Sequence, residues 1–139
     1  MISAHDTIAF TVEVTGDLTN KKWFGKFAAK ATLSHRDKLA RDRLRREYLG
    51  EKAEDASAEA RATAAIFSEL GVRLMTTPEW WVAADNGLDL KDSNLVSEIF
   101  KGAMKIENDF IVELTKAADE AKKPLDAKAK ELDAEPKTE

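Results

Sequence analysis

The sequence predicts an α+β fold that is mainly α-helical, with an N-terminal β-hairpin followed by a bundle of three to four helices, the last one long. Three observations predict it. Apolar and polar residues alternate near the N-terminus, helix start and stop signals recur through the middle of the chain, and a helical apolar stripe fills its last third. We assign residues 1–122 to a single hairpin-plus-helical domain and expect residues 123–139 to form a frayed or disordered charged tail.

An alternation with a period of two residues predicts the hairpin. Apolar side chains occupy every second position of residues 7–15, and residues 23–31 repeat the pattern after a stretch of turn-forming residues. The loop between them is longer than the tight two-residue type. An isolated hairpin is only marginally stable, so we expect this one to pack on the helices or to add to another sheet.

Capping signals predict the first two helices. Ser34 and Asp37 resemble a capping box that opens a helix ending at Leu49, and Gly50 stands where a left-handed C-cap residue is expected. A second helix should span about residues 57–75, because its apolar residues recur every four positions on one face.

Two further start signals predict the remaining helices. Thr77 as a hydroxyl N-cap and Pro78 at the first helical position open a short helix. Asp92 or Ser93 caps the last helix, from about residue 94 to 122, which Pro124 ends. Its apolar stripe comprises Leu95, Ile99, Ala103, Ile106, Phe110, Leu114, Ala117 and Ala121. The spacing is that of a packed or coiled seam, and Phe100 and Ile111 widen it, which suggests contact with more than one neighbour.

Composition excludes several classes of protein. The chain has 139 residues, enough for one modest core, and a net charge of −4 with no dominant sign, which argues against a main role in gripping nucleic acid. It has no cysteine, which excludes disulfides and thiolate chemistry and fits a reducing cytoplasm. The first residues lack a basic segment followed by an apolar one, so we expect no signal peptide, and no run is long enough for a membrane span.

No motif in the sequence indicates catalysis. His5 and His35 are the only histidines, and we interpret both as solvated side chains. Residues 85–92 are acidic but lack the ligand spacing of a calcium-binding loop, so a turn followed by a helix cap accounts for them. We therefore expect a protein that is not an enzyme and has no catalytic residues, no cofactor and no metal site.

The aromatic residues are the candidates for contacts with a partner protein. Trp80 and Trp81 are adjacent in a helix and point about 100° apart, so one can seal the core while the other anchors a partner, or two elements can bury both. The predicted partner-binding residues are Trp23, Phe24, Phe27, Trp80, Trp81, Phe100, Phe110 and Ile111.

The helix of residues 35–49 carries a second candidate surface. Arg36, Arg41, Arg43, Arg45 and Arg46 could lie along a phosphate backbone or meet an acidic partner. Acidic residues are interleaved with these cations and could pair with them along the helix, for example Asp37 with Arg41 and Asp42 with Arg46. The alternative is therefore a solvated or partner-facing helix.

Taken in order, several short segments resemble a known family. They are Trp23-Phe24-Gly25-Lys26-Phe27, Leu33-Ser34, Leu49-Gly50, Thr77-Pro78-Glu79-Trp80-Trp81, Gly87-Leu88-Asp89-Leu90, Asp92-Ser93-Asn94-Leu95, and a long helix with Glu107 and Phe110. Across residues 7–115 the chain resembles the small tail assembly chaperones, or related tail proteins, of tailed bacteriophages. Residues 36–46 are more basic than that pattern.

The resemblance implies a non-enzymatic protein of the host cytoplasm. Such chaperones coat the long helical tape-measure protein until tail-tube subunits polymerise around it, they self-associate, and they are often made in a short form and a frameshift-extended form. The implied partners are thus phage proteins and further copies of the chain, with neither nucleic acid nor membrane expected. Two alternatives remain: a permanent head or tail component of the virion, and a nucleic-acid-binding accessory protein that uses the arginine-rich helix.

Overall fold

The computed structural model describes residues 2–134, with side chains described through residue 122. Its elements, in chain order, are β1 (Thr7–Thr15), β2 (Lys22–Lys30), α1 (His35–Leu49), the 3₁₀ turn η1 (Ala53–Asp55), α2 (Ala58–Arg73), β3 (Leu74–Thr76), α3 (Glu79–Ala83) and α4 (Ser93–Ala134). The fold is α+β and mainly helical, with an N-terminal hairpin and a long last helix, so these parts of the prediction are confirmed.

The strands form an antiparallel sheet in the order β1-β2-β3. β1 and β2 pair without interruption from Thr7 opposite Lys30 to Thr15 opposite Lys22. β3 was not predicted: the second helix ends at Arg73, before the expected residue 75, because the chain there extends and pairs with β2 at Ala28 and Ala29. This pairing across the sheet outweighs the local helical pattern.

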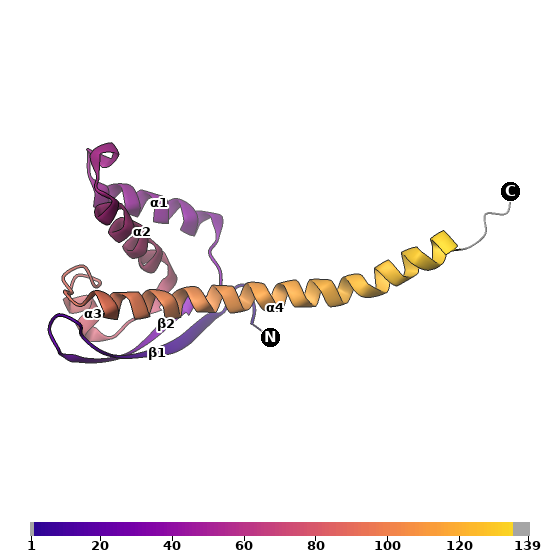
Figure 1. Ribbon diagram of the computed structural model, residues 1–139, viewed down its shortest axis with the longest axis horizontal. Helices are drawn as coiled ribbons and strands as arrows, with labels where there is room; N and C mark the ends of the chain where they lie inside the picture. The colour runs from indigo at the N-terminus through magenta and orange to yellow at the C-terminus, as the bar shows by residue number, and fades with distance from the viewer. Residues whose placement is uncertain (1, 135–139) are drawn as a thin grey trace.

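One face of the sheet is covered and the other is open. α4 lies along the covered face, α3 packs near the hairpin loop, and the α1–α2 pair projects past α4, with the end of α2 leading directly into β3 (Figure 1). The core gathers on the covered face around Phe27, Leu70, Trp81, Leu95 and Ile99. The alternation read from the sequence is therefore what separates the two faces of the hairpin.

α4 extends well beyond the sheet (Figure 1). It continues through Pro124 to Ala134, so the predicted helix end at Pro124 is wrong. Proline removes one backbone hydrogen bond, but the alanine- and lysine-rich residues that follow it are strong helix formers. The predicted tail of residues 123–139 thus begins inside a helix, and its residues 135–139 lie outside the described part of the chain.

Helix capping follows the sequence at α1 and departs from it at α3. The Ser34 hydroxyl accepts from the Asp37 amide, the Asp37 carboxylate accepts from the Ser34 amide, and Gly50 closes α1 with a φ of 76°. Pro78 itself is the N-cap of α3, which begins one residue later than predicted and has no side-chain cap.

Of the helices within residues 2–134, none is long and apolar enough to cross a membrane.

Asp92 connects the start of α4 to the hairpin loop. The sequence predicted a capping side chain, but the carboxylate turns away from its own helix. It accepts hydrogen bonds from the Leu18 and Thr19 amides at 2.9 and 2.8 Å, from the Thr19 hydroxyl and from Trp23 Nε1 at 2.9 Å. These donors, chiefly the Thr19 hydroxyl, hold the pKa of Asp92 below its usual range. A buried carboxylate thereby fixes the position of the loop relative to α4.

Candidate protein-binding surface

The aromatic cluster around α3 belongs mostly to the core. Trp81 is 3% exposed and Phe27 is fully buried, so both are core residues of this chain, and a partner contact by either one stays a prediction. Trp81 stacks on Phe67 at 6.3 Å and meets the edge of Phe27 at 5.8 Å. Gly87, with a φ of 87°, lets the chain pass directly over the Trp81 ring.

Trp23 and Trp80 are half-buried and pack against each other at 4.8 Å. Their polar atoms are already occupied, because Trp80 Nε1 donates to the Phe24 carbonyl at 2.9 Å and Trp23 Nε1 donates to Asp92. Of the two readings of the tryptophan pair, Trp81 is the core residue, and a partner contact by Trp80 stays a prediction. Phe24, on the open face of the sheet, is 66% exposed.

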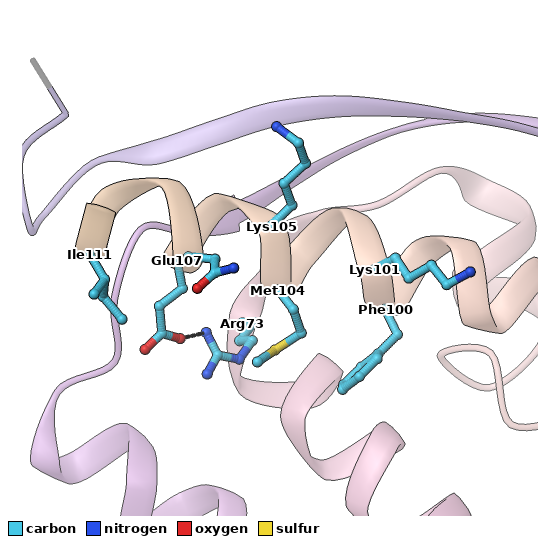
Figure 2. Close-up of a pocket in the computed structure, with 8 residues that line it drawn as sticks. Arg73, Phe100, Lys101, Met104, Lys105, Glu107 and Ile111 are labelled. Carbon is cyan, nitrogen blue, oxygen red and sulfur yellow. Dashed lines mark ion pairs between the residues drawn. The ribbon is translucent and has the colours of Figure 1, made fainter. Parts of the chain in front are cut away.

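A groove of about 550 Å³ runs along one side of α4, next to the end of α2 (Figure 2). Phe100, Met104, Glu107 and Ile111 point into it from α4 and Arg73 from α2, whereas Lys101 and Lys105 extend away from Arg73 (Figure 2). The α4 residues follow steps of four and three, so they share one face of the helix. An apolar lining with a buried ion pair at its centre suits a segment that carries both apolar and charged side chains.

The same face of α4 continues beyond the groove. Leu114 lies one step of three after Ile111, and the two side chains are 57% and 46% exposed. We call Phe100, Met104, Glu107, Ile111 and Leu114 the groove face. The predicted seam of Leu95, Ile99, Ala103 and Ile106 is instead buried on the sheet, and Phe110 at its end is half-buried. α4 therefore presents two apolar faces, of which the groove face has no complete cover from the described residues.

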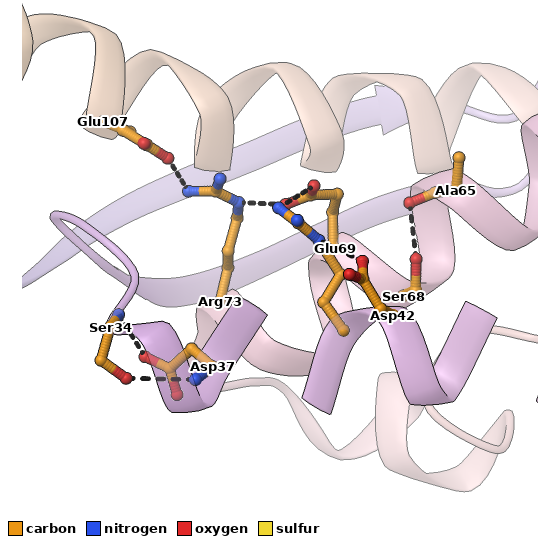
Figure 3. Close-up of polar contacts among 9 residues, drawn as sticks. Ser34, Asp37, Asp42, Ala65, Ser68, Glu69, Arg73 and Glu107 are labelled. Carbon is orange, nitrogen blue, oxygen red and sulfur yellow. Dashed lines mark hydrogen bonds and ion pairs between the residues drawn. The ribbon is translucent and has the colours of Figure 1, made fainter. Parts of the chain in front are cut away.

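A chain of ion pairs runs from the groove and joins three helices (Figure 3). Arg73 is 4% exposed and lies between Glu107 of α4 and Glu69 of α2, with its Nε 2.7 Å from Glu69. Arg41 of α1 reaches the other Glu69 oxygen at 3.0 Å. A buried guanidinium requires such partners, since an unpaired charge in the interior is very costly. The network fixes the α1–α2 pair beside the groove.

The arginine-rich helix α1 divides into a docked and a solvated side. Arg41 is half-buried and pairs with Glu69 and Asp42, while Asp37 pairs with Lys30, so the predicted pairs of Asp37 with Arg41 and Asp42 with Arg46 are not formed. The solvated side carries the other predicted arginines, which are exposed and make no ion pair within the described residues: Arg36, Arg43, Arg45 and Arg46.

The sequence indicated part of this surface and missed the rest. Phe100 and Ile111 were singled out because they widen the stripe of the last helix, and Phe110 because it belongs to that stripe. Met104 and Glu107 continue the four-three spacing from Phe100, and that spacing could have revealed the groove face. The buried Arg73 had no signal, because a cation in a helix is ordinarily solvated.

Comparison with models of protein families, with curated proteins and with solved structures finds no match to this chain. Among the side chains that the structure describes, no group of histidine, aspartate and glutamate residues could hold a metal ion.

Proposed function

We propose that this protein is a non-enzymatic assembly factor that binds amphipathic helices through the groove face of α4. The observation that carries the proposal is that α4 keeps apolar side chains exposed at Ile111 and Leu114, at the end of the groove. Because this face leads into a groove lined by Phe100 and Met104, an amphipathic helix could bury its apolar side along both.

The partner we propose is the tape-measure protein of a tailed phage or another tail component bound during virion assembly. The resemblance to tail assembly chaperones supports this choice, as does the kind of ligand that the groove face suits. Such clients carry long amphipathic helices whose apolar stripes must be covered before assembly. A small protein with one helix-binding face per copy would cover them in repeated units.

Co-purification with the tape-measure protein tests the proposal, using variants matched for exposure. Aspartates at Ile111 and Leu114 (I111D/L114D) should abolish capture, since a charge on the groove face opposes burial against an apolar helix. Val112→Asp is the control, because Val112 is 61% exposed but lies on another side of α4. Equal capture by I111D/L114D and the wild type, or equal loss with V112D, would refute the groove face as the site.

Quantitative mass spectrometry of mature virions beside infected-cell lysates separates a chaperone from a virion component. A chaperone should be abundant in lysate and absent from finished particles. Stoichiometric copies in the virion would instead identify a structural subunit.

A second candidate function is binding of nucleic acid, favoured by the exposed arginines on the solvated side of α1. Replacing Arg36 and Arg43 with glutamine should then weaken binding to duplex DNA and reduce its salt dependence by about one phosphate contact per arginine. If DNA is not bound at low salt, this alternative is excluded.

A further inference from the structure

The outer edge of β1 is unpaired within the part of the chain that the structure describes. In the hairpin, the Gly16 amide donates to the Lys21 carbonyl and the Ala31 amide donates to the Asp6 carbonyl. Hydrogen-bonded pairs alternate along an antiparallel ladder, so the even-numbered residues of β1 bond to β2. The odd-numbered residues direct their amides and carbonyls outward.

Four of these outward residues remain available for pairing: Thr7, Ala9, Thr11 and Glu13. The next one, Thr15, is already engaged, since its carbonyl accepts from Asn94 Nδ2 at 2.8 Å. Natural sheets protect such edges with lysine, proline, bulges or short strands. β1 has none of these over its nine residues, because its register with β2 is uninterrupted and its only charged residue is Glu13. An edge of this kind is a ready template for another strand.

We propose that β1 pairs with β1 of a second copy of this chain, antiparallel and across a two-fold axis at Phe10, which joins two three-stranded sheets into one. An interface of this symmetry must be complementary to itself. Only a two-fold axis at Phe10 lets all four outward residues form hydrogen bonds. Ala9 of one copy then lies opposite Thr11 of the other, and Thr7 lies opposite Glu13. These two residue pairs occur twice, giving up to about eight backbone hydrogen bonds.

The covered face of the sheet supplies an apolar contact at the same axis. A cavity of about 550 Å³ follows the β1 edge between the strand and α4, lined by Ile8, Phe10, Val12 and Ile106. Ile8 and Phe10 are only half-buried in one copy. The axis brings the two Phe10 rings together at the mouths of the two cavities, where each covers the exposed part of the other.

The position of α4 allows this approach. α4 packs on both β1 and β2, so two copies related by the axis would place their α4 helices about two strand spacings, roughly 9.6 Å, apart. Packed helices are separated by about 8–10 Å. Gly102, whose absent Cβ would meet the Phe10 ring at 2.5 Å, lies at the same level as the axis and presents no side chain.

Some of the charged side chains near Gly102 can also pair across this axis. Glu98, Lys101, Lys105 and Asp109 line the edge cavity on this side of α4, and Glu98 and Lys105 lie on either side of Gly102 along the helix. Antiparallel helices related by an axis near Gly102 bring Glu98 of each copy opposite Lys105 of the other. None of the groove-face residues takes part in this second-copy contact, although Lys105 borders both the groove and the edge cavity. Variants of β1 therefore test the contact independently of the proposed function.

Sedimentation velocity over a concentration series tests the pairing. The wild type should sediment as a dimer. Thr11→Pro should be monomeric, because proline removes the outward amide of residue 11 and keeps the β1–β2 hydrogen bonds made by even-numbered residues. Thr11→Val is the matched control: it keeps the amide and a β-branched side chain and should remain dimeric. Circular dichroism should show the same fold for all three proteins.

Cysteine cross-linking tests the register without depending on the proline variant. The chain has no native cysteine, so A9C/T11C should form a disulfide-linked dimer on mild oxidation, whereas A9C and T11C alone should not. A dimeric T11P protein, or cross-linking by A9C alone, would overturn this interface. The proposal would also be overturned if the wild type is monomeric and its Thr11 amide is protected from hydrogen exchange only when a tail protein is added. In that case the partner of β1 is an extended segment of that protein and not a second copy of the chain.

Discussion

Replacing the buried Arg73 tests how the α1–α2 pair is held beside the groove. The Arg73→Met change keeps the aliphatic volume of the side chain and removes the guanidinium that lies between Glu69 and Glu107. Glu69 retains its ion pair with Arg41, but Glu107 has no other cation partner among the described side chains. The main expected effect is therefore an uncompensated carboxylate facing the groove.

The size of the expected loss of stability follows from how deeply the Arg73 and Glu107 side chains are buried. Removing one partner of a buried ion pair costs about 3–5 kcal/mol. Arg73 is 4% exposed, but the Glu107 side chain keeps 22% of its surface in water and can be partly rehydrated. We therefore expect the free energy of unfolding to fall by about 2.5 kcal/mol, which lowers Tm by roughly 10 °C for a chain of this size.

Urea unfolding followed by circular dichroism measures this loss, with two further variants as references. Lys105→Met breaks the exposed pair with Asp109 and should cost no more than about 0.5 kcal/mol. R73M/E107L removes both charges of the buried pair and should be more stable than R73M alone by at least about 1 kcal/mol. The reasoning is refuted if R73M costs no more than K105M, or if the double variant is less stable than R73M.

Two further predictions concern positions that fix the fold around the surface. Gly87→Ala should lower the free energy of unfolding by about 2–4 kcal/mol, because the residue has a positive φ and its Cβ would overlap the Trp81 ring. Gly50→Ala, with a similar φ and open space around the Cβ, should cost less, since only the backbone strain remains. Equal losses would contradict the overlap. Asp92→Asn should lower Tm near neutral pH, where the carboxylate accepts its hydrogen bonds. Because the folded-state pKa of Asp92 is depressed, its stabilisation is present above the ordinary value of 3.8 and is lost as the pH falls through the lower folded value. The Tm difference between wild type and D92N should thus be constant from about pH 5 to 8 and should become smaller below pH 3.8. A Tm difference that grows in acid would contradict a stabilising role of the ionised Asp92 carboxylate.

Local signals were sufficient for the elements whose stability is set locally. The capping box of Ser34 and Asp37 and the alternation of the hairpin both involve residues close in sequence, so their patterns could be read directly. The seam from Leu95 to Ile106 was also predictable, since a helix that packs on a sheet needs one apolar stripe. What covers that seam could not be read from its spacing.

Contacts between distant residues account for what the sequence missed. β3 is three residues long and exists because it pairs with β2, more than 40 residues earlier. The side chain of Asp92 resembles a helix cap in sequence, yet its partners are Thr19 and Trp23, 73 and 69 residues away. Phe27 contacts both tryptophans at 5.8 Å, so the deeper burial of Trp81 depends on Phe67, which reaches it from another helix, and on Gly87, where the chain passes over its ring.

The two proposed surfaces occupy different sides of α4, and this arrangement bears on how a long client would be bound. Pairing through β1 uses the side that carries Glu98 and Lys105, which leaves the groove face of each copy accessible. The two-fold axis makes the α4 helices antiparallel and places the two groove faces on opposite outer sides of the dimer. A client helix with repeated apolar segments could then contact one face while another of its segments binds the second. Even where each contact is weak, such linkage raises overall affinity by roughly 100- to 10,000-fold. A weak groove on each copy is therefore compatible with tight but releasable coating of a long helix.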